Sequence, residues 1–192
     1  MKKILFICSA ILLNLHAFSQ SNAGFYGGLN YSNVTMESPS ISSESRTGFQ
    51  LGAYVRSGNI LYGQFGLEYV TTQSYFSIND SNDIYNADEV RWHMLNFPIY
   101  AGLNLIPVAD RLINVRVYAG PDVSLVLNVP VNDLSFAPED FAKVRIDGTV
   151  GAGFDLLLFS LDAGYNFGLS NVFSDNYNGK AHYAFVNLGL KF

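Results

Sequence analysis

Apolar and polar residues alternate with a period of two along the chain from residue 23 onward. Such alternation is typical of β-strands whose two faces meet different surroundings. In the segment 47–56, for example, Phe49, Leu51 and Val55 share one face, and Gln50 and Arg56 lie on the other. The pattern predicts eight strands, at 23–32, 47–56, 60–72, 91–105, 112–125, 143–156, 159–169 and 181–192.

The connections between these segments alternate in length. Three are short, at 57–59, 106–111 and 157–158, and four are longer, at 33–46, 73–90, 126–142 and 170–180. Short and long connections that alternate predict an up-and-down meander with all its short turns at one end. The weakest of these turns is Leu157-Leu158, because it lacks the Gly, Asn or Asp that two-residue hairpins favour.

The distribution of charge indicates which face is outside. The apolar faces contain no charged residue, and only 14% of the whole chain is charged, against about 25% in an ordinary globular domain. The segments also have about the 9–11 residues that a membrane-spanning strand needs. The sequence therefore predicts an all-β protein: an eight-stranded antiparallel up-and-down transmembrane β-barrel with its apolar faces in lipid.

The N-terminal residues have the pattern of a cleaved secretory signal. Lys2 and Lys3 precede an apolar stretch from Ile4 to Leu15, and Ala17 and Ser19 supply the small residues of a cleavage site. We expect a signal peptide at 1–20 and a single barrel domain at 21–192. Cleavage would leave 9 basic and 16 acidic residues, a net charge of −7, which argues against a nucleic-acid partner.

The last strand ends on an aromatic residue at the chain terminus. Alternating apolar residues precede it, giving the series Val186, Leu188, Leu190 and Phe192. This ending resembles the assembly signal of bacterial outer-membrane barrels. The resemblance implies that the C-terminal strand engages the outer-membrane barrel assembly machinery.

Short motifs spread along the chain carry a wider resemblance. They are FYGGLNYS at 25–32, LNFPI at 95–99, YAGP at 118–121, GAGF at 151–154 and YNFGL at 165–169. In this order they resemble the strands of the porin-like outer-membrane β-barrel family of Bacteroidetes-type bacteria. The resemblance implies the bacterial outer membrane as location, with its lipids and lipopolysaccharide as surroundings, and it implies no defined activity.

Charged residues on the polar faces form the main candidate site. In an eight-stranded barrel the second and sixth strands lie across the lumen, and they end on Arg56 and Asp155 near the short turns. Such a barrel is just wide enough for its own side chains. We therefore predict a mixed-sign network that fills the lumen, with a narrow ion path as the alternative. Its predicted members are Arg56, Glu68, Arg116, Asp155, Asp162 and Lys191.

The sequence gives little evidence for a catalytic or metal-binding site. His93 and His182 fall near the outer rim without a His-x-Ser pairing. The acidic segment around Asp80 and Asp83 fails the calcium-loop pattern, because Ile84 stands where an oxygen ligand is needed. We expect no catalytic, cofactor or metal site.

The function expected from these features is a non-enzymatic barrel that displays acidic extracellular loops for envelope structure, adhesion or partner contact. A small porin-like channel is the first alternative. A secreted, lipocalin-like ligand-binding barrel is the second, although the inward charges argue against it. An outer-membrane enzyme comes last.

Overall fold

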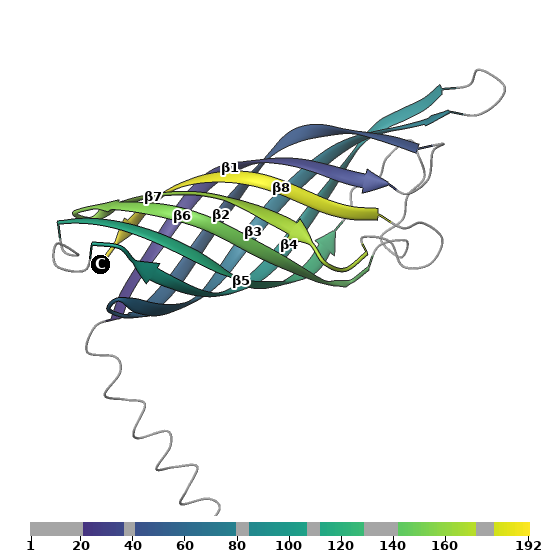
Figure 1. Ribbon diagram of the computed structural model, residues 1–192. Coiled ribbons are helices and arrows are strands. Elements are labelled where there is room, and N and C mark those ends of the chain that lie inside the picture. The colour runs from purple at the N-terminus through teal and green to yellow at the C-terminus, as the bar shows by residue number, and fades with distance from the viewer. Residues whose placement is uncertain (1–20, 37–40, 80–84, 107–111, 129–141, 172–178) are drawn as a thin grey trace, which may run out of the picture.

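The computed structural model of the chain is a closed barrel of eight antiparallel strands (Figure 1). The structure describes residues 21–36, 41–79, 85–106, 112–128, 142–171 and 179–192. The predicted signal peptide at 1–20 lies outside the described residues. The strands are β1 (Ser21–Met36), β2 (Ile41–Gly58), β3 (Leu61–Asn79), β4 (Tyr85–Asn104), β5 (Ile113–Asn128), β6 (Val144–Leu156), β7 (Phe159–Gly168) and β8 (Gly179–Lys191).

Each strand pairs with its neighbours in the chain, and β1 also pairs with β8. The closure satisfies backbone groups that would otherwise be stranded in a hydrocarbon environment. The last residue takes part in it, because Phe192 and Ala23 exchange two backbone hydrogen bonds of 2.8 and 3.2 Å. Within the described ranges, no helix is long and apolar enough to cross a membrane.

The two faces of the wall differ as the alternation predicts. Apolar side chains point outward and stay accessible, as Leu51 (57% exposed) and Leu188 (68%) do. Their strand neighbours Gln50 and Asn187 point inward and are 2% and 5% exposed. The protein is thus apolar outside and polar inside, which is the reverse of a water-soluble barrel.

The short turns and the C-terminus lie at one end of the barrel (Figure 1). The β2–β3 connection turns at Gly58, which has a φ of 127°. The β6–β7 connection turns at Leu157 and Leu158, as expected, and Leu157 adopts a φ of 55° there. In outer-membrane barrels the short turns face the periplasm, so the resemblance noted above implies that the opposite end is extracellular.

The barrel wall is uneven in height. β2, β3 and β4 contain 18, 19 and 20 residues, whereas β6, β7 and β8 contain 13, 10 and 13. The predicted ranges 47–56, 60–72 and 91–105 are therefore too short at the extracellular end. Above the membrane both faces of a strand meet water, so the alternation that marks a strand in lipid is lost.

The upper parts of β2, β3 and β4 form a raised sheet, made of residues 41–45, 74–79 and 85–92 (Figure 1). The register of β4 with β5 reaches His93 and Asn128, and the part of β4 beyond His93 pairs with β3 among the described residues. The register of β2 with β1 likewise ends at Arg46 and Ser32.

Aromatic rings lie against glycines on the inner wall. Tyr26 on β1 is opposite Gly52 on β2, and Tyr118 on β5 is opposite Gly151 on β6. A Cβ at either glycine would come within 2.5 Å of the facing ring. The glycines therefore make the room that bulky side chains need in a narrow lumen.

Candidate functional site

Charged side chains gather at three heights in the lumen. We call them the periplasmic cluster (Arg56, Arg116, Asp155, Asp162 and Lys191), the central cluster (Glu68, Asp122, Tyr100, Thr149 and Asn166) and the outer cluster (Arg145, Asp147, Ser124 and Met94). A charge away from water needs both a partner and hydrogen bonds to be tolerated. The contacts of each cluster therefore decide what the lumen can do.

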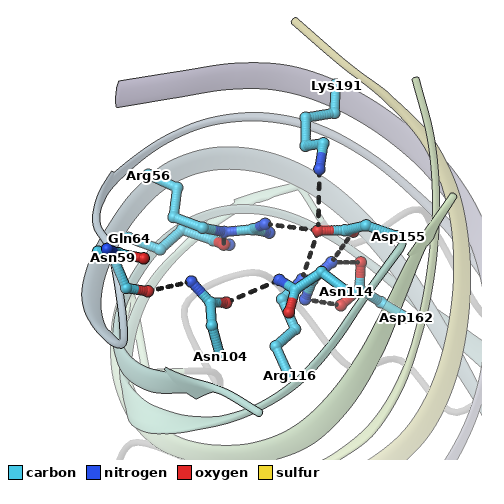
Figure 2. A network of polar contacts seen from close by, with 9 residues as sticks. All are labelled: Arg56, Asn59, Gln64, Asn104, Asn114, Arg116, Asp155, Asp162 and Lys191. Atoms are coloured by element: carbon cyan, nitrogen blue, oxygen red, sulfur yellow. Dashed lines mark hydrogen bonds and ion pairs between the residues drawn. The ribbon is translucent and has the colours of Figure 1, made fainter. Parts of the chain in front are cut away.

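Arg116 on β5 is the most heavily bonded member of the periplasmic cluster (Figure 2). Its Nη1 and Nη2 donate to the two carboxylate oxygens of Asp162 at 2.5 and 2.7 Å. Nη2 also donates to Asp155 Oδ1 at 3.2 Å, and Nε donates to Asp155 Oδ2 at 3.4 Å. The planar guanidinium thus clamps carboxylates from β6 and β7 in paired geometry, which is the strong form of this interaction.

Asp155 is the hub of the same cluster. Besides Arg116 it accepts from Arg56 Nη1 at 3.3 Å and from Lys191 Nζ at 3.4 Å. Its side chain is 1% exposed. Figure 2 shows the three cations converging on this carboxylate from different sides of the barrel, which links β2, β5 and β8 to β6 across the lumen.

Neutral groups hold the cations in place. Arg56 Nε donates to Gln64 Oε1 at 3.0 Å, and its guanidinium lies 4.8 and 5.1 Å from the ring centres of Tyr54 and Tyr62. These contacts fix the guanidinium between two π faces, which favour a cation.

A chain of amides continues the network along the periplasmic rim (Figure 2). Asn114 Nδ2 donates to Asn104 Oδ1 at 2.8 Å, and Asn104 Nδ2 in turn donates to the carbonyl oxygen of Asn59 in the β2–β3 turn. The turn is thereby tied to the lumen side chains.

The central cluster differs because no basic side chain bonds to its carboxylates in the described contacts. Asp122 accepts from Tyr100 Oη at 3.1 Å, from Asn166 Nδ2 at 3.1 Å and from Thr149 Oγ1. Glu68 accepts hydrogen bonds from Tyr26 and Asn96. Both carboxylates are 5% exposed or less.

The outer cluster is a single ion pair along β6. Arg145 Nη2 donates to both oxygens of Asp147 at 3.2 Å, and Nη1 contacts Met94 Sδ at 3.4 Å. Ser124 adds a 3.4 Å hydrogen bond to Asp147.

The structure brings together five of the six lumen residues singled out from the sequence, as the periplasmic cluster. The sixth, Glu68, lies in the central cluster instead. Sequence reasoning missed Arg145, although its parity on β6 is that of the inward-facing Asp147 and Asp155. The amides of Asn104 and Asn114 were also missed, because uncharged polar residues are common on every inward face.

His93 and His182 lie on the outward-facing sides of β4 and β8, toward the extracellular end. Tyr69 Oη lies 2.6 Å from His93 Nδ1, and the ring of Tyr165 stacks on that of His182 at 6.3 Å. Among the described residues, no group of three or more His, Cys, Asp or Glu side chains could hold a metal ion. Asp80 and Asp83 of the acidic segment lie outside the described residues.

A cavity of about 20 Å³ lies between the periplasmic and central clusters, with Arg56, Glu68, Tyr26 and Tyr183 in its wall. This is room for roughly one water molecule.

A closed barrel with an apolar belt outside and paired charges inside defines a transmembrane β-barrel protein. A family model described as an outer membrane protein beta-barrel domain matches residues 18–174. The chain belongs to this family, and the protein is a bacterial outer-membrane protein. The predicted fold class and location are thus confirmed, and the secreted, lipocalin-like alternative is wrong.

Solved structures agree on the fold. The outer membrane protein OprG from Pseudomonas aeruginosa matches with a TM-score of 0.56 at 8% identity, over 90% of this chain and 96% of that chain. Neisserial surface protein A matches with a TM-score of 0.51 at 11% identity, over 88% and 97%. Among curated protein sequences, none matches this chain.

Proposed function

We propose that this protein is a non-enzymatic outer-membrane barrel whose lumen is plugged by its own side chains and which acts through its extracellular face. Envelope structure, adhesion or contact with an external partner are the roles open to such a protein. The acidic loops predicted to serve them lie largely outside the described residues.

The periplasmic cluster is the observation that supports a plug. Its ion pairs join β2, β5, β6, β7 and β8, so the charges meet across the lumen and do not line an open path. Opening a path would separate buried ion pairs, which is strongly unfavourable when a charge loses its partner.

Planar-bilayer recording of the purified, folded protein tests the plug. We expect no sustained conductance from the wild type. Asp155→Asn, which removes the hub of the cluster, should give brief current steps above the wild-type background. Thr47→Ser, a conservative change outside all three clusters, is the control. Steady open channels from the wild type, with a current altered in Arg56→Ala, would instead establish the small porin-like channel.

The raised sheet supports a role at the cell surface. β2, β3 and β4 are the longest of the eight strands and extend farthest from the short turns (Figure 1), so a partner outside the cell would meet them first. Removing residues 75–89 and joining the shortened strands by an Asn-Gly turn tests this role. Cells with the shortened protein should lose adhesion or partner capture while keeping normal amounts of folded barrel, and unchanged adhesion would contradict it.

We also propose that residues 1–20 direct export and that the C-terminal strand is read by the barrel assembly machinery. Leu188, Leu190 and Phe192 lie on the outward face or at its end, where another protein can reach them before the barrel enters lipid. The short motifs along the strands support kinship with porin-like barrels of Bacteroidetes-type bacteria.

A further inference from the structure

The end of the barrel with the short turns carries an arc of exposed apolar side chains (Figure 1). We propose that this apolar rim lies among the acyl chains of the adjacent lipid leaflet and fixes the depth at which the barrel sits in the membrane. Neither the plug nor the cell-surface role depends on this contact. The residues of the apolar rim are Leu105, Leu112, Leu157, Leu158 and Phe192.

Backbone hydrogen bonds bring the parts of the apolar rim together. The amide of Leu157 donates to the carbonyl oxygen of Leu112 at 2.8 Å, and the amide of Lys191 donates to that of Leu158 at 2.7 Å. The Lys191 side chain points into the lumen, where it bonds to Asp155. The five rim side chains are each at least 53% exposed, so the outer surface that they form is apolar.

The conformation of Leu157 indicates a role for its side chain. Its φ of 55° lies in the left-handed region, which Gly, Asn and Asp adopt more easily than Leu does. Leu158 beside it also lacks the chemistry that two-residue turns favour. The two side chains remain 53% and 59% exposed, so packing within the chain does little to offset the strain. A contact outside the chain therefore has to stabilise this turn.

The length of the β6–β7 hairpin places the turn at the boundary of the hydrocarbon. A membrane-spanning strand needs about 9–11 residues, and β7 has 10. Its outward side chains Phe159, Leu161 and Tyr165 are all exposed apolar or aromatic groups. No part of β7 is left over to carry the turn clear of the lipid, so Leu157 and Leu158 lie where the acyl chains begin.

The surroundings of the turn favour lipid over a protein partner. Exposed apolar patches that bind other proteins are typically bordered by polar residues. Here the outward neighbours of the turn are Leu156 and Phe159, and Phe154 and Leu161 follow them on the same face. The apolar rim therefore continues into the lipid-facing surface without a polar border.

Spin labels measure the depth of the turn directly. Leu158→Cys and Asn59→Cys place single thiols in two turns at the same end, because Cys8, the only cysteine of the chain, lies in the predicted signal peptide and is left out of the mature protein, residues 21–192. Asn59 belongs to the polar turn Ser57-Gly58-Asn59 and is the matched control.

The labelled variants are compared in vesicles of dioleoylphosphatidylcholine. The nitroxide at position 158 should collide more often with oxygen, which concentrates in hydrocarbon, than with a water-soluble nickel chelate. The nitroxide at position 59 should show the reverse. If position 158 behaved like position 59, the apolar rim would lie in water and the proposal would be overturned in favour of a protein partner.

The urea midpoint of Leu157→Asn separates lipid contact from turn geometry. Asn adopts the left-handed conformation more readily than Leu, so turn geometry alone would raise the midpoint. We expect a lower midpoint in the same vesicles, because the variant takes an apolar side chain out of the acyl region. Leu157→Met keeps an apolar contact and should leave the midpoint nearly unchanged. An unchanged or raised midpoint of Leu157→Asn would overturn the proposal.

Discussion

At the scale of single residues, a few buried polar atoms with several partners each connect the strands across the lumen. Asp155 bonds to Arg56, Arg116 and Lys191, which come from three different strands. Burying charges is costly by itself, so this arrangement is stable only while the partners balance one another. Removing one member therefore affects all the others.

Asp155→Asn should strongly destabilise the barrel, because it leaves three buried cations with Asp162 as their only carboxylate. Breaking a buried pair in this way costs about 3–5 kcal/mol. Urea unfolding followed by the fluorescence of Trp92, the single and nearly fully buried tryptophan, measures the loss.

The double variant Asp155→Asn, Lys191→Met is the control for that experiment. It removes one of the excess cations, so it should recover part of the lost stability. A double variant no more stable than Asp155→Asn alone would show that packing, and not charge balance, explains the effect.

The outward face allows a similar test at one residue. Val150 lies near the middle of β6 and is 46% exposed toward lipid, whereas its neighbour Thr149 is 1% exposed and bonds to Asp122. An arginine at the lipid midplane costs about 2–4 kcal/mol. Val150→Arg should lower the urea midpoint in lipid vesicles accordingly, and Val150→Leu should leave it nearly unchanged. If Val150→Arg left the urea midpoint unchanged, the outward face of β6 would not lie in lipid.

At the scale of strands, the distance between neighbouring backbones is set by glycines. A Cβ built on Gly120 of β5 would overlap the backbone carbonyl oxygen of Ile99 on β4, whereas one on Gly63 of β3 meets nothing within 4 Å. The two positions therefore differ in steric room although both lie in strands.

Gly120→Ala should lower the unfolding midpoint or prevent folding, because the two strands would have to separate at that point. Gly63→Ala should be neutral or stabilise by up to about 1 kcal/mol, since it reduces the freedom of the unfolded chain. Equal effects of the two changes in urea unfolding would contradict the close approach of β4 and β5.

The strands were predictable where lipid and lumen impose opposite polarity on alternate residues. All eight were found from this pattern. The raised sheet was not, since Ser42 and Ser43 follow Ile41 at the start of β2, and Asn86 and Asp88 lie in the upper part of β4, so the apolar series of the lower strands does not continue there. The position of Glu68 in the central cluster, and not in the periplasmic cluster, could not be predicted from the sequence either. The stagger between strands decides which inward-facing residues meet, and no local sequence pattern encodes that stagger.

At the scale of the whole molecule, closure of the barrel depends on β1 meeting β8. Phe192 takes part through its backbone, which bonds to Ala23, and through its ring, which lies 5.3 Å from that of Phe25. The backbone contact belongs to the finished barrel. The exposed ring is the part that an assembly factor would read during insertion under the proposed role of the C-terminal strand.

Phe192→Ala separates these two roles. It keeps the hydrogen bonds to Ala23 and removes only a ring that is 63% exposed, so refolded protein in vesicles should lose little stability, less than about 1 kcal/mol. In cells the same change should sharply reduce the folded protein in outer-membrane fractions, as judged by resistance to protease. Leu161→Ala, another exposed residue of the lipid face but away from the terminus, serves as the control and should assemble normally. If Phe192→Ala lowered stability in vesicles as much as it lowered assembly in cells, the ring would be a structural part of the barrel seam and not a signal for assembly.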